Sequence, residues 1–279
     1  YDQWKVVEPL FTKFYNKTSE EYLYSILPTA TQYARNSFFA GLLPLEIEKR
    51  FPDKWFNDNE DGNKNEFEFD FLKDQMKRLG LQGKSSKYIK ILNADFERKI
   101  LDDFNQHKNN DLLVIVYNFI DILSHAKTDN TIVDQLIRDD KTFRSLTYNW
   151  FENSSLIKII KLAAENGFKL VITTDHGMIY VRKPSKVVGD RETSTNIRYK
   201  TGKSLTYEDK DVWAITNPEK LFLPKGNVSS KYIFAKNNLF FAYPKNYNHF
   251  VNYYKDTYQH GGISLEEIII PFSVLEPRK

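Results

Sequence analysis

The stretch Lys169-Leu-Val-Ile-Thr-Thr-Asp-His-Gly-Met178 decides the fold class, because it joins a strand pattern directly to chemically active side chains. Residues 170–173 form a short apolar and β-branched run, which is typical of a buried strand. Asp175 and His176 follow it, and Gly177 lets the chain turn away without a side chain. In open α/β sheets, sites form outside the carboxyl ends of strands. The stretch therefore predicts a carboxylate and an imidazole at such an edge. The alternative is an Asp that caps the next helix, with a surface His beside it.

The composition limits the chemistry that is available to the chain. Its 279 residues are 41% hydrophobic and 28% charged, which fits a globular protein with one large domain or two small ones. A net charge of +3 is too small to indicate nucleic-acid binding by itself. The chain has no cysteine, so disulfides and Cys-ligated zinc are excluded, and any metal must use His and carboxylates. No apolar run reaches membrane-spanning length and no signal peptide opens the chain, so we expect a cytoplasmic protein without membrane insertion.

Strands and helices alternate through the middle of the chain. Residues 112–117, Leu-Leu-Val-Ile-Val-Tyr, form a second buried strand pattern. Residues 154–166 form an amphipathic helix pattern, with Gly167 at its carboxyl end. The strand pattern at 170–173 follows directly. This order predicts an α/β fold with a mainly parallel sheet.

Two further segments contain histidines that could bind a ligand or a metal. Asp121 and His125 follow the strand at 112–117 and are four residues apart, so on a helical turn they point the same way. They form either a metal pair or a surface carboxylate–histidine pair. Near the carboxyl end, His260 precedes two glycines, where the backbone can approach a ligand closely. A turn capped by Ser264 is the alternative for that segment, but it leaves His260 unexplained.

Thr31 stands on a turn after a predicted strand at 20–27 and opens a helical pattern. Such a residue either caps the helix or acts as a nucleophile where the helix N-terminus stabilises anionic oxygens. Thr29 is the neighbouring alternative for the nucleophile. Arg35 follows one turn later in the same helical pattern.

Residues 182–211 are basic and show little periodicity, so they read either as a solvated loop or as a mobile flap over the site. In the second interpretation its cations meet anionic substrate. The predicted substrate-binding side chains are Arg35, Arg191, Arg198, Lys200 and Lys203.

The candidate ligands form one chemically consistent set: Thr31, Asp121, His125, Asp175, His176 and His260. Oxygen and nitrogen donors without cysteine suit a site of two zinc ions, about 4 Å apart. Two such cations can hold both the attacking and the leaving oxygen of a phosphoryl group.

The order and spacing of these motifs resemble the alkaline phosphatase superfamily. Pro28-x-x-Thr31 is similar to its nucleophile turn, Asp121-x-x-x-His125 to its second-metal pair, Asp175-His176-Gly177 to its first-metal pair, and His260-Gly261 to its closing ligand. More narrowly, the segments 27–35, 198–200 and 259–267 resemble a PglZ domain. Within that group the chain is most similar to the effector domain of PorX-type response regulators of the type IX secretion system in Bacteroidota.

This resemblance implies a three-layer α/β sandwich with a central, mostly parallel sheet. It implies a single PglZ domain over residues 1–279 with a cap or flap insertion at 178–231. The superfamily places one more metal-ligating Asp at the end of its first strand, a few residues before the segment that matches Tyr1-Asp-Gln-Trp4, so the domain is expected to lack that strand here. The resemblance also implies a receiver domain and a helical linker upstream of this sequence. As partners it implies a sensor kinase and components of the secretion system. Whether the domain forms a homodimer is left open.

The function expected from the residues and the resemblance together is zinc-dependent hydrolysis of phosphodiesters of nucleotides or oligonucleotides. Thr31 would attack phosphorus and form a phosphothreonine intermediate. One rival is a phosphomonoesterase; a sulfatase is disfavoured because it needs a Cys- or Ser-derived nucleophile. The other rival is a catalytically idle, metal-stabilised output domain that signals by binding a partner.

Overall fold

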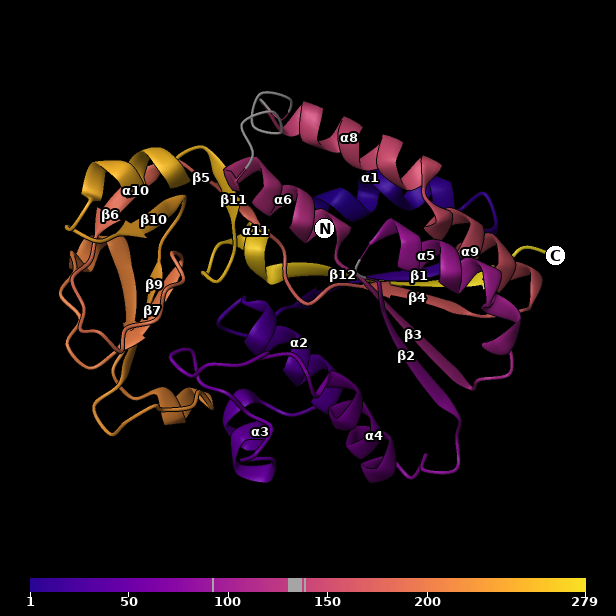
Figure 1. The fold of residues 1–279 in the computed structure, drawn as a ribbon, viewed down its shortest axis with the longest axis horizontal. Helices are drawn as coiled ribbons and strands as arrows, with labels where there is room; N and C mark the ends of the chain where they lie inside the picture. The colour runs from indigo at the N-terminus through magenta and orange to yellow at the C-terminus, as the bar shows by residue number, and fades with distance from the viewer. Residues whose placement is uncertain (92, 130–136, 138) are drawn as a thin grey trace. The chain divides into compact units, whose positions relative to one another are not determined.

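The computed structural model describes residues 1–91, 93–129, 137 and 139–279 (Figure 1). The chain divides into two compact units. Unit 1 contains residues 1–23, 81–174 and 271–279, and unit 2 contains residues 24–80 and 175–270.

Unit 1 contains most of the alternating helices and strands that the sequence predicts. Its helices are α1 (Asp2–Phe11), α5 (Ala94–Asp102), α6 (Phe119–Asp129), α8 (Asp140–Asn153) and α9 (Ser155–Glu165). Its strands are β1 (Tyr15–Tyr24), β2 (Ser86–Ile91), β3 (Leu112–Tyr117), β4 (Leu170–Thr173) and β12 (Ile269–Pro277), of which β1 and β12 run into unit 2 at one end.

The strands of unit 1 form two small sheets. One has the order β1-β12-β4, with β12 antiparallel to β4. The other pairs β2 with β3 in parallel. The single central, mostly parallel sheet that we expected is not seen among the described residues. The last strand, β12, runs antiparallel to β4, and within the described part of the chain no strand ladder joins β3 to β4.

Helix α9 explains how the core of unit 1 is built. Leu156, Ile159, Ile160 and Ala163 are buried, at the spacing that places apolar side chains on one side of a helix. Leu156 and Ile160 pack with α1 and α8, while Ile159 and Ala163 pack with β2 and α5. Figure 1 shows α1 beside α8 and α5 beside α9, in agreement with these contacts. Each of the leucine and isoleucine side chains stabilises the fold by roughly 1.5–3 kcal/mol when fully buried.

Unit 2 carries the remaining elements, many of them short. Its helices are α2 (Thr31–Ala40), α3 (Pro44–Arg50), α4 (Glu68–Arg78), α10 (Tyr247–Tyr254) and α11 (Leu265–Ile268). Its strands are β5 (Ile179–Val181), β6 (Lys183–Lys186), β7 (Tyr199–Gly202), β8 (Val212–Ile215), β9 (Lys231–Ala235), β10 (Leu239–Ala242) and β11 (Thr257–Gln259). They form a parallel pair β10-β6, an antiparallel pair β11-β5 and an antiparallel sheet β7-β9-β8.

The basic stretch 182–211 is more ordered than its sequence predicts. It contains β6 and β7, and β7 is a fully paired edge of the β7-β9-β8 sheet. The expectation of a loop is therefore wrong at these strands. Three of the four residues of β7 are buried, yet none of its side chains is aliphatic, so no apolar alternation marks the strand.

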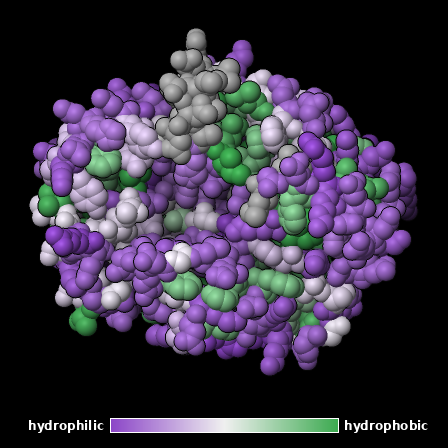
Figure 2. All heavy atoms as spheres, viewed as in Figure 1, coloured by the Kyte–Doolittle hydropathy of each residue, from purple (hydrophilic) through white to green (hydrophobic). Residues whose placement is uncertain are grey.

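The surface is mainly hydrophilic on the face that Figure 2 shows, and apolar side chains occur there in small groups. Across the described part of the chain, no helix combines the length and apolar composition needed to cross a membrane.

Candidate functional site

Gly177 fixes the turn that follows Asp175 and His176. Its N–H donates to the carbonyl oxygen of Glu267 at 2.8 Å. A Cβ atom at this position would lie 2.0 Å from the carbonyl oxygen of Glu266, so only glycine fits. The sequence predicted that Gly177 is needed because it has no side chain. The reason in the structure is that the backbone of Glu266 and Glu267 lies directly against it.

The His176 ring has a defined orientation. Its Nδ1 lies 2.9 Å from the carbonyl oxygen of Gly177, and its Nε2 lies 3.0 Å from Oγ1 of Thr31. A carbonyl oxygen only accepts, so Nδ1 carries a proton, and in the neutral ring Nε2 then has the lone pair. The Thr31 hydroxyl consequently donates to Nε2. The structure thus brings together two residues that are 145 positions apart in the sequence.

His260 is held in the same way and lies directly against His176. Its Nδ1 donates to the carbonyl oxygen of Thr29 at 3.0 Å, so in the neutral ring Nε2 is the acceptor nitrogen. The two imidazole rings stack with their centroids 3.9 Å apart and an interplanar angle of 14°. Histidines that donate from one nitrogen to a carbonyl and present the other are the usual arrangement of metal ligands.

Asp175 and Arg35 complete this group in unit 2. Oδ2 of Asp175 lies 3.7 Å from Nε2 of His176 and 4.0 Å from Nε of Arg35. Arg35 also makes a 2.7 Å ion pair with Glu68, whose side chain is 1% exposed. Thr31 and Arg35 are four residues apart on α2, so both face the same side of the helix. Two imidazoles, a carboxylate and a hydroxyl are a donor set that fits zinc without any cysteine.

The structure distinguishes Thr31 from Thr29. The residue that precedes α2 in the cap position is Ala30, so Thr31 is not the cap of this helix. Thr29 is completely buried, and its Oγ1 accepts from the N–H of Gly261 at 3.0 Å and donates to the carbonyl of Gly262 at 2.8 Å. The hydroxyl of Thr29 is therefore engaged with the backbone, while that of Thr31 lies at the histidines.

Asp121 and His125 lie on α6 in unit 1, as predicted. Oδ1 of Asp121 is 3.4 Å from Nε2 of His125, and the two side chains are 40% and 48% exposed. They face the same way, as residues four apart on a helix do. Their role as metal ligands stays a prediction.

The predicted substrate cations divide into two groups. Arg191 is exposed, and Lys203 makes a half-exposed ion pair with Glu192 at 2.7 Å. Arg198 and Lys200, in contrast, are 0% and 1% exposed. The interpretation that these two project from a surface flap is wrong, because each is enclosed by the sheet and its neighbours. Whether Arg191 and Lys203 contact substrate stays a prediction.

Lys200 belongs to a buried polar cluster that the sequence did not reveal. Its Nζ donates to the carbonyl of Ser194 at 2.8 Å and lies 4.5 Å from the centre of the Tyr243 ring. Burial lowers the pKa of Lys200 to about 7, although the carboxylate of Asp58 opposes the shift. Burial likewise raises the pKa of Asp58 above its usual value, against the hydrogen bonds it accepts from tyrosines. Asp58 lies in the polar stretch 52–66, which reads as a plain surface loop.

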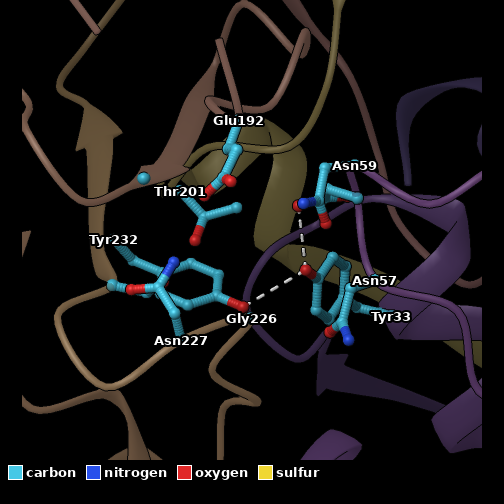
Figure 3. A pocket seen from close by; sticks show the side chains of 11 residues that line it. Tyr33, Asn57, Asn59, Glu192, Thr201, Gly226, Asn227 and Tyr232 are labelled. Carbon is cyan, nitrogen blue, oxygen red and sulfur yellow. Dashed lines mark hydrogen bonds between the residues drawn. The ribbon is translucent and has the colours of Figure 1, made fainter. Parts of the chain in front are cut away.

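Three tyrosines surround Asp58. Its carboxylate accepts from Tyr199 at 2.8 Å and from Tyr33 at 2.9 Å. The phenol groups of Tyr33 and Tyr232 meet at 3.2 Å (Figure 3). Asp58, Tyr33 and Tyr232 border a polar hollow of about 320 Å³ that is partly open to solvent. Tyr33 is two residues after Thr31, or about 200° further around α2, so the hollow lies on the opposite side of the helix from the Thr31 hydroxyl.

Comparison with known proteins supports the resemblance at the level of the family. The sequence profile of the BREX system PglZ alkaline phosphatase-like domain matches residues 1–275. No curated protein matches the chain. The narrower resemblance to PorX-type response regulators is not tested by these comparisons and stays a prediction.

Solved structures agree in fold. Phosphonoacetate hydrolase from Sinorhizobium meliloti 1021 in complex with phosphonoformate has a TM-score of 0.55 at 10% identity, over 98% of this chain and 84% of that one. The same enzyme in complex with phosphonoacetate gives 0.37 at 13% identity over 65% and 50%, which is too low to add to the argument. The similarity at this identity concerns the fold alone. The match to residues 1–275 is what assigns the family: the chain belongs to the PglZ alkaline phosphatase-like domains.

Proposed function

We propose that this domain hydrolyses phosphoesters with Thr31 as the nucleophile and zinc as the cofactor. The observation that carries the proposal is the 3.0 Å contact between Oγ1 of Thr31 and Nε2 of His176, beside the stacked ring of His260. A hydroxyl at the start of a helix, next to two imidazoles and a carboxylate, is an unusual surrounding for a structural threonine.

The metal ligands in this proposal are Asp175, His176, His260 and Thr31, with Asp121 and His125 added from the order of the family motifs. Two zinc ions per chain are proposed. Bound zinc supplies positive charge that lowers the pKa of an attacking hydroxyl and balances the charge on phosphoryl oxygens.

The residues of the chain then act as follows. Thr31 gives its hydroxyl proton to solvent, and its oxygen bonds to phosphorus in line as the ester P–O bond breaks. The leaving oxygen takes up a proton from solvent and departs as the alcohol. Water hydrolyses the resulting phosphothreonine and restores the hydroxyl. Arg35, whose guanidinium Glu68 orients, holds non-bridging oxygens together with the first N–H groups of α2, which have no partner within the helix.

The substrate and setting are further parts of the proposal. Phosphodiesters of nucleotides or oligonucleotides are preferred over monoesters, with Arg191 and Lys203 as contacts for neighbouring phosphates. The domain would act in the cytoplasm as the effector of a response regulator that controls type IX secretion. These statements rest on the motif resemblance described above.

Hydrolysis of bis-p-nitrophenyl phosphate against p-nitrophenyl phosphate, with zinc and after chelation, tests the proposal on the full-length protein. Phosphonoacetate belongs in the same panel, because the structurally similar hydrolase is named for it. We expect zinc-dependent turnover that is faster on the diester. Bound zinc without turnover on any of the three would favour the idle, partner-binding domain.

A further inference from the structure

Arg198 and Glu267 form an ion pair that is completely enclosed in unit 2. Both side chains are 0% exposed. Nε of Arg198 donates to Oε1 of Glu267 at 3.0 Å, and Nη2 donates to Oε2 at 2.8 Å. This is the two-pronged geometry that makes arginine–carboxylate pairs strong and directional. Burial alone would raise the pKa of Glu267, but the charge and hydrogen bonds of Arg198 outweigh it, so the pKa lies below its usual value.

The carboxylate of Glu267 also holds the turn that carries His260. Oε1 accepts from the N–H of Gly262 at 2.9 Å. Oε2 accepts from the N–H of Ser264 at 3.0 Å and from its hydroxyl at 2.8 Å. The turn lies so close to the pair that a Cβ at Gly262 would be 2.7 Å from Nη2 of Arg198. The pair therefore fixes the backbone immediately after His260.

The backbone of the same residue holds the other histidine turn. The carbonyl oxygen of Glu267 accepts from the N–H of Gly177, which directly follows His176. One residue thus binds both turns, the His260 turn through its side chain and the His176 turn through its main chain. Arg198 is itself anchored to the sheet, because its carbonyl accepts from the N–H of Ala235 at the end of β9 at 2.8 Å.

Stability alone is a weak reason for such a pair. The cost of removing two charges from water often equals or exceeds their attraction, and apolar replacements of similar volume are frequently as stable. The carboxylate of this pair also accepts three hydrogen bonds from one turn, so the pair fixes the position of that turn. An apolar replacement would not do so.

We propose that Arg198 and Glu267 are positioning residues, which set the spacing of His176 and His260 for metal binding. This inference rests on the proposed metal-dependent function. In it, Arg198 supports the histidine turns from the protein interior and does not contact the substrate.

Zinc affinity of the chelator-treated protein, measured by calorimetric titration with zinc alone, tests the inference without any turnover. Arg198→Lys keeps the charge but loses the two-pronged geometry. Ser264→Ala keeps the pair but removes one of its bonds to the turn. Both should weaken zinc binding, Arg198→Lys by about tenfold or more, as is usual when the support of a metal ligand is lost. Glu267→Gln should weaken it further.

Val212→Ala is the matched control. Val212 is buried in the β8 side of unit 2, where it packs with Val187 and Ile233, so its truncation destabilises the unit without touching either histidine turn. If Val212→Ala weakens zinc binding as much as Arg198→Lys does, the effect is general destabilisation and the inference is overturned. Unchanged affinity in Arg198→Lys and Ser264→Ala also overturns it, even if Glu267→Gln fails to fold.

The two proposals fail in different ways. A wild-type protein that binds no zinc contradicts both of them. Zinc binding that responds to Arg198→Lys, without hydrolysis of any phosphoester, supports the positioning role and contradicts the hydrolase alone.

Discussion

At the scale of single residues, the two threonines of the Pro28–Thr31 turn differ in what their hydroxyls do. Thr31→Ala should remove the nucleophile and lower turnover by roughly a thousandfold or more, while the zinc content persists because the imidazoles and carboxylates remain. Thr29→Val should instead lower thermal stability, since it leaves the Gly261 N–H and the Gly262 carbonyl without the buried hydroxyl. Steady-state kinetics, zinc analysis and thermal melts on both variants separate these roles. Full activity in Thr31→Ala would move the nucleophile elsewhere.

Lys200 gives a second prediction at this scale, on the pH dependence of stability. Its pKa is about 7 in the folded chain and near its usual 10.5 when unfolded, so between these values only the unfolded chain holds the proton. The free energy of unfolding should therefore rise with pH across this window. Lys200→Met should remove that contribution and reduce the increase between pH 7 and pH 9 by roughly 2 kcal/mol. Urea denaturation at both pH values measures it.

The exposed Lys231 on β9 supplies the control for this measurement. Lys231→Met should keep the increase seen in the wild type. An identical increase in Lys200→Met would show that Lys200 titrates in the folded chain as an ordinary surface lysine does.

At the scale of elements, α9 allows a clear prediction because its buried side is well defined. Ile159 is completely buried, so Ile159→Ala should cost roughly 2–5 kcal/mol of unfolding free energy. Lys158, its neighbour in the chain, is exposed, and Lys158→Ala should change stability by about 0.5 kcal/mol or less. Denaturant titration of the two variants decides it. Similar losses for both would mean that α9 does not pack through this side.

The elements also show where sequence reasoning succeeds. The run at 170–173 was predicted as a strand and is β4, and the helix predicted at 154–166 is α9 at Ser155–Glu165. Both are set by local apolar periodicity. Strand β7 was not found, because its burial depends on partners that sequence spacing does not indicate: Arg198, which precedes it, pairs with a carboxylate 69 residues further on. Asp58 was missed for the same reason, since its tyrosine partner Tyr199 is 141 residues away.

The candidate site likewise has a part that the sequence identifies and a part that only the structure shows. The residue types and their order identified Thr31, Asp175, His176 and His260, which the structure brings together in unit 2. The sequence favoured Thr31 over Thr29 without showing what either hydroxyl contacts, and it assigned Arg198 to the surface. Both questions depend on which atoms a side chain meets, and a single sequence does not contain that information.

At the scale of the whole molecule, the prediction concerns metal content. Protein purified without chelator should contain up to two zinc ions per chain, and His125→Ala or His260→Ala should lose mainly the second. Because a ligand that binds only the folded state stabilises it, chelation should lower the melting temperature of the wild type. Elemental analysis and thermal melts give both values. Full zinc occupancy in both variants would contradict the ligand assignment.

The division of the chain between the two units has a consequence for synthesis on the ribosome. Unit 1 is assembled from three separate segments, and β12, which lies between β1 and β4, comes from the last of them. Thr18 on β1 bonds to Val274 on β12 across 256 residues. Until the ribosome has made β12, β1 and β4 have no strand to join them, so this sheet cannot form. The nascent chain must therefore delay this step until β12 has emerged, and in that interval it is a natural client for chaperones.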